Sequence, residues 1–362
     1  MPKTNCTERF YAAACQLDLP NPSHRGEIPG RVERMLQMVD QAVCGYEPLF
    51  DVRLVVFPEF AHAAPMYPTA EELADKLALP IPNEHTDRYH QKARQRGVYI
   101  QTGTFLESDP RWPGHVFNAT CLIGPDGLLA KYRKVHPWIP WEVHTSPHDL
   151  PGYDEPLFPV AETEIGRIGA AICYDWLFPE AIRQLGLAGA EILVRVSAYM
   201  DPWGTAQPLD WWTLVNRVRA IENMAYVVAA NQAASLANYP PFSWPGGSMI
   251  VDYDGRILAQ ADPGPHERIV VGPIDLAALR AERERRRGHH MLAHLRTEAY
   301  PAPNKGVFLG VSEGAGPKSG PARALALADP DLGCLVAAWP NLSEADRAAV
   351  MAFLRVAAPR SG

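Results

Sequence analysis

Short runs of apolar residues recur along this chain, separated by segments in which apolar positions have helical spacing. The runs have the length of buried strands and are expected at residues 10–17, 52–57, 98–105, 165–172, 190–196, 225–231 and 268–274. Helices are expected between them, at residues 31–43, 86–96, 179–187, 208–224 and 276–287. Strands that alternate with helices in this way predict sheets covered by helices.

Two local patterns sharpen these helix predictions. Thr86 is a candidate N-cap of the helix at 86–96, and Gly97 lies just past its end. The helix at 208–224 is amphipathic, and its expected buried side carries Trp212, Val215, Val218 and Ile221.

Two hairpins complete the pattern. The turn Gly124-Pro-Asp-Gly127 separates strands expected at 117–123 and 128–133, and a second turn, Asp252-Tyr-Asp-Gly255, divides residues 249–259. The order strand, helix, strand, helix, strand, hairpin therefore occurs twice. Two similar α/β halves are expected, within a domain at residues 1–300.

The C-terminal segment has a different composition. Residues 301–330 are rich in Gly, Pro and Ala, which is typical of an extended arm. Ser343-Glu-Ala-Asp346 resembles a capping box and predicts a helix at 345–356. We expect residues 301–362 to form an arm and a terminal helix that pack on their own subunit or on a neighbouring one.

Composition excludes several classes of protein. Of the 362 residues, 47% are hydrophobic and 21% are charged, as in ordinary globular proteins, and the net charge of −7 argues against a nucleic-acid partner. No apolar stretch approaches the ~20 residues that span a membrane, and the N-terminus lacks the apolar core of a secretory signal. We therefore expect a cytoplasmic protein with no membrane or nucleic-acid partner.

The cysteines indicate neither a disulfide framework nor a zinc site. They have no C-x-x-C spacing and form no cluster with histidines, and they stand at positions 6, 15, 44, 121, 173 and 334. His290 and His294 lie four residues apart in a helical segment, but no third ligand accompanies them. We expect no metal and at least one reactive thiol.

One cysteine stands where a thiol can react. Cys173 ends the apolar run at 165–172, and Pro179-Glu180 open a helical pattern shortly after it. On such a turn the thiol stands clear of the sheet, the N–H of Tyr174 points to the same space, and the helix N-terminus favours negative charge. A single cysteine of this kind is more often part of the core, so a base and a cation must accompany it.

Glu59 and Lys134 are the candidates for that base and that cation. Glu59 follows a buried strand, and its apolar neighbours Pro58 and Phe60 favour the raised pKa that suits a general base. Lys134 ends another strand and enters a loop rich in Pro and Trp. Because Glu59, Lys134 and Cys173 each lie at the carboxyl end of a predicted strand, one edge of the sheets can gather all three.

Three further polar residues have more than one interpretation. Glu142 is a second carboxylate in the aromatic loop, or the partner of a nearby Arg or Lys. His136 is either a rival base or an anchor of its loop. Asp175, two residues beyond the cysteine, is more simply a residue that stabilises the turn.

Three segments resemble, in order and separation, the motifs of the nitrilase, or carbon–nitrogen hydrolase, superfamily. They are Phe57-Pro-Glu59-Phe, Tyr132-Arg-Lys134-Val and Ile172-Cys173-Tyr-Asp. The chain is most similar to the aliphatic amidase and formamidase branch, in which a second glutamate follows the lysine by eight residues, as Glu142 does here. This resemblance implies a four-layer α-β-β-α sandwich, here with a C-terminal extension, and a homo-oligomer whose arms embrace the partner.

The resemblance also implies a mechanism. Cys173 attacks the carbonyl carbon of a small amide, Lys134 and the N–H of Tyr174 hold the oxyanion, and Glu59 carries the thiol proton to the leaving ammonia. Glu59 then activates water against the thioester, and Glu142 orients the substrate or assists this second step. No cofactor or metal is required.

The chain departs from its relatives around the cysteine. Tyr174-Asp175 stands where nitrile-specific members carry Trp-Glu, which favours amides as substrates. Aromatic residues predict a pocket shaped for something other than acetamide, and the candidates to line it are Trp138, Trp141, Trp176, Tyr199 and Trp203. Each of these aromatic residues taken alone is more often ordinary core.

Four functions remain open on this basis. An amidase that releases ammonia is the leading hypothesis, followed by a hydrolase of N-carbamoyl compounds that anchors its ureido acid through Arg195 or Arg183. A nitrilase is the third. A catalytically silent scaffold is the fourth, and the complete set of Glu59, Lys134, Glu142 and Cys173 argues against it.

Overall fold

The computed structural model describes residues 7–138, 142–199, 210–233, 245–286 and 288–299. The chain divides into two units, one made of residues 1–137 and 143–295 and the other of residues 138–142 and 296–362. The first unit contains every described strand and α-helix, and the second contributes the short 3-10 turn Thr297–Ala299. The predicted arm and terminal helix at 301–362 lie outside the described residues, and the predicted boundary at residue 300 stays a prediction.

Two six-stranded mixed sheets form the centre of the first unit. In the first sheet the strands lie in the order β12 (Arg268–Asp275), β1 (Arg9–Gln16), β2 (Val52–Val56), β3 (Tyr99–Ser108), β4 (Val116–Gly124) and β5 (Gly127–Arg133). In the second the order is β11 (Ile257–Gln260), β10 (Met249–Val251), β9 (Tyr226–Asn231), β8 (Ile192–Ser197), β7 (Gly166–Ile172) and β6 (Val160–Thr163). The central strands β1–β3 and β7–β9 are parallel, and the remaining pairs are antiparallel.

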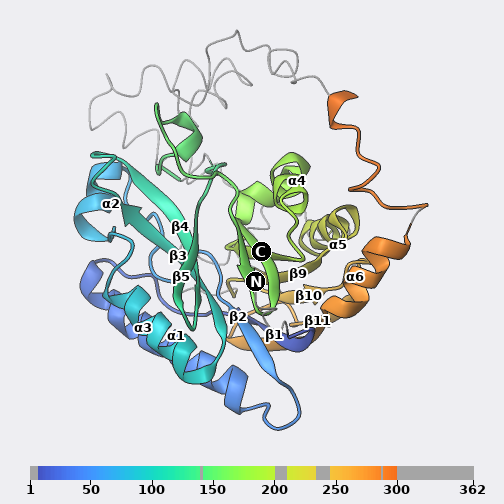
Figure 1. Ribbon diagram of the computed structural model, residues 1–362. Coiled ribbons are helices and arrows are strands. Elements are labelled where there is room, and N and C mark those ends of the chain that lie inside the picture. The colour runs from blue at the N-terminus through green and yellow to red at the C-terminus, as the bar shows by residue number, and fades with distance from the viewer. Residues whose placement is uncertain (1–6, 139–141, 200–209, 234–244, 287, 300–362) are drawn as a thin grey trace, which may run out of the picture. The chain divides into compact units, whose positions relative to one another are not determined.

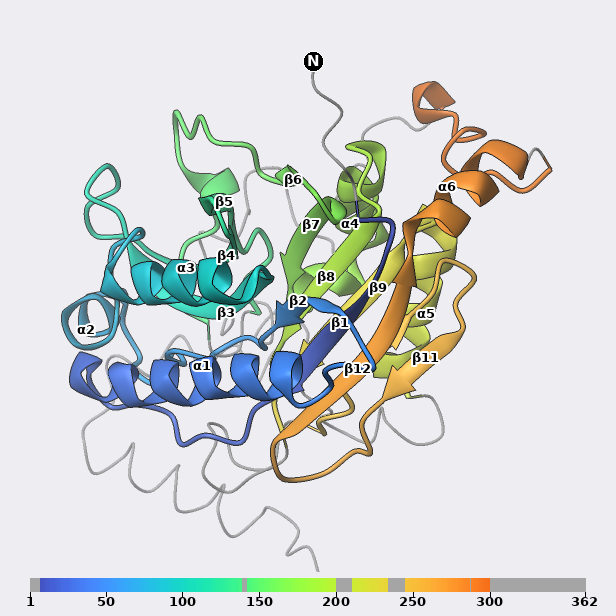
Figure 2. The same cartoon turned by 60° about the horizontal axis from the view of Figure 1, so that its bottom comes forward.

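The alternation of side chains along each strand builds the layers. On β1, Ala12 and Ala14 belong to the core between the two sheets, whereas Ala13 and Cys15 belong to the core beneath the helices. Because alanine is small, the two sheets can approach closely. Helices cover the outer faces, α1 and α3 on the first sheet and α4 and α5 on the second (Figures 1 and 2). The four-layer α-β-β-α arrangement is therefore confirmed.

The helices lie close to their expected positions. Their observed bounds are α1 (Ile28–Cys44), α2 (Ala70–Lys76), α3 (Glu84–Arg96), α4 (Pro179–Leu187), α5 (Trp211–Asn223) and α6 (Leu276–Arg285). The sequence did not predict α2, which Thr69 caps by accepting a hydrogen bond from the N–H of Glu72. The cap of α3 is Asn83 rather than Thr86, which instead completes a capping box as the third helical residue.

The predicted buried side of α5 is wrong in part. Trp212 is buried as expected, but Val218 is 37% exposed, and the helix buries polar residues instead. The other inward residues are Asn216, Arg219, Ala220 and Asn223. Hydrogen bonds explain why these polar side chains face inward. Asn216 accepts a hydrogen bond from Arg195 of β8, and Arg219 donates one to the carbonyl of Trp176 in the turn after Cys173.

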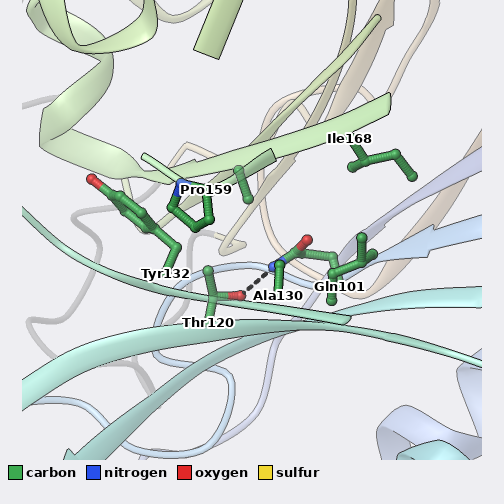
Figure 3. A pocket seen from close by; sticks show the side chains of 8 residues that line it. Gln101, Thr120, Ala130, Tyr132, Pro159 and Ile168 are labelled. Atoms are coloured by element: carbon green, nitrogen blue, oxygen red, sulfur yellow. Dashed lines mark hydrogen bonds between the residues drawn. The ribbon is translucent and has the colours of Figure 1, made fainter. Parts of the chain in front are cut away.

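A small cavity lies between the sheets (Figure 3). Gln101 donates a hydrogen bond to the Thr120 hydroxyl at 2.8 Å there, while its carbonyl oxygen has no partner among the described residues. Tyr132, Pro159 and Ile168 also line the cavity (Figure 3). Glu59, Lys134 and Cys173 do not line it, so it is separate from the candidate site. No helix within the described ranges combines the length and the apolar character needed to cross a membrane.

Candidate active site

The candidate site lies where several strands of the first unit end. Glu59 comes after β2, Lys134 directly follows β5, and Cys173 directly follows β7. Strands β2 and β5 point the same way, because β3 is parallel to β2 and two antiparallel steps lead from β3 to β5. Their carboxyl ends therefore lie at the same edge, as the sequence predicted.

Glu59 and Lys134 form a buried ion pair. The Lys134 ammonium lies 2.8 Å from Glu59 Oε1, and the two side chains are 0% and 1% exposed. Asn118 on β4 donates to the same Oε1 at 2.8 Å, and the N–H of Ala198, just past β8, donates to Oε2 at 2.9 Å. The carboxylate is therefore held from three directions, by groups of both sheets.

The backbone around Glu59 is anchored as firmly. Phe60 has a left-handed conformation with φ of 58°, which is costly for a residue with a side chain. Arg31 of α1 stabilises this turn by donating to the carbonyls of Ala61 and Phe60 at 2.7 and 3.0 Å. Thr104 accepts from the Phe60 N–H at 2.8 Å, and the Gln232 amide donates to the Glu59 carbonyl at 2.7 Å.

Cys173 also has a left-handed conformation, with φ of 42°, and it opens the 3-10 turn η3 (Cys173–Leu177). The residue as a whole is half-buried. Burial and the Glu59 carboxylate raise its pKa, while Lys134, Arg195 and the Ser197 hydroxyl act in the opposite direction. A thiol in this environment is protonated at neutral pH, so its attack requires a base, and Glu59 is the carboxylate that it senses most strongly.

Asp175 connects the turn of Cys173 to the segment that carries Lys134. Its buried carboxylate accepts four hydrogen bonds, from the Ile172 N–H at 3.0 Å, the Tyr132 hydroxyl at 2.7 Å, and the N–H and Nδ1 of His136 at 2.9 and 2.8 Å. Tyr132 and His136 stand two residues on either side of Lys134. This geometry favours the interpretation of His136 as an anchor of its loop, and it gives Asp175 a larger role than the turn alone.

The predicted pocket residues have different surroundings. Trp176 is fully buried, and its indole N–H donates to the Ala171 carbonyl at 3.1 Å. Tyr199 is 8% exposed, and its N–H donates to Asn231 at 2.8 Å. Tyr174 lies edge-on to Phe178, with ring centroids 5.1 Å apart. The roles of all three toward a substrate stay predictions, and Trp141 and Trp203 lie outside the described residues.

Trp138 and Glu142 belong to the second unit. Within that unit the Glu142 carboxylate accepts a hydrogen bond from the Trp138 N–H, and the Glu142 N–H donates to the Trp138 carbonyl at 3.1 Å. The catalytic role of Glu142 stays a prediction.

The remaining thiols and histidines differ from this cluster. Cys15 and Cys121 are buried and free, and desolvation raises the pKa of both thiols, whereas Cys44 is exposed and free. The ring centroids of His290 and His294 are 6.5 Å apart. Across the described part of the chain, no group of three His, Cys, Asp or Glu residues could hold a metal ion. Cys6 and Cys334 lie outside the described residues.

Sequence reasoning missed three supports of the site. Asn118 lies in the middle of β4, Arg31 lies on α1, and Ala198 contributes only its backbone N–H. In the sequence, Asn118 is marked only as a polar residue within a largely apolar strand. Arg31 is marked only as a charged residue on the inner side of an amphipathic helix.

Comparison with known proteins finds a family model that matches most of this chain. The family model of the carbon–nitrogen hydrolases matches residues 11–284. A formamidase of Bacillus cereus (strain Q1) is 29% identical over 263 residues, which are 71% of this chain and 72% of the relative.

Two solved structures share the fold. Nit3 of Saccharomyces cerevisiae, a member of branch 10 of the nitrilase superfamily, superposes with a TM-score of 0.64 at 24% identity, over 82% of this chain and 98% of Nit3. A mutant amidase from Nesterenkonia sp. AN1, which carries the acetamide moiety of fluoroacetamide on its active-site cysteine, has a TM-score of 0.57 at 20% identity, over 82% and 97%. The family model covers both halves of the first unit and all three candidate residues, and the chain is a member of the carbon–nitrogen hydrolase family.

Proposed function

We propose that this protein is a cysteine-dependent amidase that hydrolyses a small linear amide to a carboxylic acid and ammonia. One observation carries the proposal: the buried Glu59–Lys134 ion pair, 2.8 Å long, lies in the electrostatic environment of Cys173 on its left-handed turn. These are the base, cation and nucleophile that a thiol needs to attack an amide carbonyl. The formamidase relatives support a small amide as the substrate.

In the first half of the proposed reaction Cys173 Sγ attacks the carbonyl carbon while its proton passes to Glu59. The oxyanion that forms is held by the Lys134 ammonium and by the N–H of Tyr174 at the start of η3. Glu59 then gives the proton to the amide nitrogen. The carbon–nitrogen bond breaks, ammonia leaves, and a thioester remains on Cys173.

In the second half a water molecule attacks the thioester carbon. Glu59 takes a proton from this water, and the same oxyanion contacts stabilise the second tetrahedral intermediate. Collapse of the intermediate breaks the carbon–sulfur bond, releases the carboxylic acid and returns the proton to the thiol. Glu142 is proposed to orient the substrate or to assist this step.

The test measures ammonia release from formamide, short aliphatic amides, N-carbamoyl amino acids and nitriles by the purified protein. The proposal predicts turnover of one or more of the amides, and a loss of about 10³-fold or more in Cys173→Ala, because no other group replaces the nucleophile. Preference for an N-carbamoyl amino acid or a nitrile would replace the proposed substrate class. If the protein releases ammonia from none of these substrates, the proposal that it is an enzyme of this kind is contradicted.

We also propose that the protein is a homo-oligomer. Three apolar side chains on one side of α5 are left exposed: Trp211, Leu214 and Val218 are 41%, 51% and 37% exposed. Their spacing of three and four residues makes a continuous apolar stripe of the kind that marks an interface. In sedimentation velocity at micromolar concentration we expect an oligomer that Leu214→Glu dissociates, whereas Gln91→Glu on the exposed side of α3 does not. A monomeric parent protein would contradict the proposal.

A further inference from the structure

Arg195 carries a charge in the interior of the first unit, next to the candidate nucleophile. It lies on β8 directly opposite Ala171 of β7, two residues before Cys173, and its side chain is 0% exposed. Its Nη1 donates to Asn216 Oδ1 of α5 at 2.9 Å. Its Nε and Nη2 have no hydrogen-bond partner among the described residues.

Aromatic rings surround the guanidinium. Its Cζ lies 4.3 Å from the ring centroid of Trp212, 5.4 Å from that of Tyr199 and 5.5 Å from that of Trp176. Cation–π contacts of this kind offset only part of the cost of burying a charge, which is several kcal/mol. Burial lowers the pKa of Arg195 to about 10, so the side chain keeps its charge at neutral pH. A buried cation without a contacting carboxylate calls for an explanation.

The ionisable groups that face Arg195 come from each element around it. Negative charge on the Cys173 sulfur, the Tyr199 oxygen or the Glu59 carboxylate favours the charge of Arg195, and the positive charge of Arg219 on α5 disfavours it. Arg219 already has a carboxylate partner, since its guanidinium lies 3.0 Å from Glu222. Of these groups, an ionised Cys173 is the one that favours the charge of Arg195 most.

The groups that face Cys173 lead to the same pair. Glu59 opposes a negative charge on the sulfur, whereas Lys134 and Arg195 favour it. Lys134 is already engaged at 2.8 Å by Glu59. Asp175, in the same turn, is occupied by its four hydrogen bonds from Ile172, Tyr132 and His136. Arg195 is thus the nearby cation whose charge no carboxylate offsets at contact distance within the described residues.

We propose that Arg195 is a positioning residue that acts through Cys173, supplying the positive charge that stabilises the thiolate and the oxyanion formed from it. The proposal rests on the proposed role of Cys173 as nucleophile. It also gives Arg195 a task other than anchoring a ureido acid. The guanidinium is enclosed by Trp176, Tyr199 and Trp212, so its charge acts on the sulfur through the protein interior, where screening by water is weak.

The experiment measures the rate at which iodoacetamide alkylates Cys173 at pH values between 6 and 10, and mass spectrometry quantifies the modified peptide. In Arg195→Met we expect this rate to be about tenfold lower at each pH, because about tenfold less thiolate is present. Arg195→Lys keeps the charge and should lower the rate much less. Arg183→Met on α4, which also removes a partly buried arginine, is the matched control and should leave it unchanged.

A second variant guards against misfolding of Arg195→Met. Asn216→Asp places a carboxylate on Arg195 Nη1 without removing the guanidinium, so it should also lower the alkylation rate. An unchanged rate in folded Arg195→Met or in Asn216→Asp overturns the proposal, and so does a loss of rate in Arg195→Lys as large as that in Arg195→Met. Alkylation requires no amide substrate, so a failure of the proposed amidase activity is seen separately in the ammonia assay.

Discussion

Hydrogen bonds hold Glu59, the proposed base, in one orientation. Oε1 accepts from Lys134 and Asn118, and Oε2 accepts from the N–H of Ala198. A carboxylate fixed in this way keeps one orientation, and fixed geometry is a large part of what a general base contributes. The residue-scale predictions follow from this carboxylate and from the thiol beside it.

The first prediction concerns Glu59→Gln. The amide cannot accept the thiol proton, so we expect kcat to fall by about 10²-fold or more while the protein still folds. Turnover and thermal unfolding are measured on the same preparation. Glu107→Gln is the matched control, because Glu107 is equally buried but pairs with Arg133 at 2.7 Å, and it should lower stability more than turnover. If Glu59→Gln does not fold and no active protein remains, the carboxylate has a structural role instead.

The second prediction concerns the reactivity of the thiols. Cys15 and Cys121 are completely buried, whereas Cys173 is half-buried beside Lys134 and Arg195. A small alkylating reagent should therefore modify Cys173 faster than either buried thiol, and ammonia release should decline in step with that modification. Peptide mass spectrometry on samples taken at several times gives the labelling rate of each thiol, and the ammonia assay on the same samples gives the remaining activity. Equal labelling of Cys121 with activity retained would contradict the assignment.

At the scale of elements, the site depends on how strands are tied together at their ends. Asp175 connects the turn after β7 to the segment after β5 through Tyr132 and His136. Neither strand pairs with the other, because β5 and β7 belong to different sheets. The distance between the Lys134 ammonium and the Cys173 thiol therefore depends on this carboxylate as well as on the sheets.

The third prediction tests that connection with Asp175→Asn. The amide has one acceptor oxygen, and its NH₂ group faces donors, so about two of the four hydrogen bonds are lost. We expect a lower melting temperature and a decrease in kcat per alkylatable Cys173, with KM changed less. Tyr132→Phe removes only one of the hydrogen bonds to Asp175, together with the one that the hydroxyl accepts from the Val135 N–H, and should have a smaller effect in the same direction. A lower melting temperature with unchanged turnover per Cys173 would show that Asp175 is only structural.

At the scale of the whole molecule, buried histidines make stability depend on pH. Burial lowers the pKa of His144 to about 3, lowers that of His85, and lowers that of His62 well below its usual value. The unfolded chain protonates these rings near pH 6.5, so below that pH it binds more protons than the folded protein. Stability contributed by the neutral rings is therefore present above pH 6.5 and is lost as the pH falls below it.

The fourth prediction follows from this sign. The free energy of unfolding should decrease between pH 6.5 and 4.5, by up to about 1.4 kcal/mol per pH unit for each fully neutral buried histidine. His62→Gln should flatten this limb, because the amide can replace the hydrogen bonds to Thr104 and Tyr89 without titrating. Urea unfolding at pH 7.5, 5.5 and 4.5 measures both proteins. Equal pH dependence in the two would contradict the assignment to His62.

The sequence by itself determined the elements, the family and the candidate residues for the chemistry. Apolar runs that end at Glu59, Lys134 and Cys173 predicted both the strands and the edge where these residues stand, because strand periodicity and carboxyl-end placement are local properties of the chain. The same local reasoning failed for the inner side of α5. There, the partners of Asn216 and Arg219 are distant in sequence, and no pattern along the helix reveals them.

Only the tertiary structure decided how the site is held. The left-handed turns at Phe60 and Cys173, the hydrogen bond from Asn118 to Glu59, and the buried charge of Arg195 each depend on residues from separate elements. The free-energy cost of each feature, and its effect on the site, appear only when folding removes a polar group from water and brings a partner to it. Residue types and order were therefore enough to name the candidate reacting groups, whereas the electrostatic environment and the contacts that orient them exist only in the folded chain.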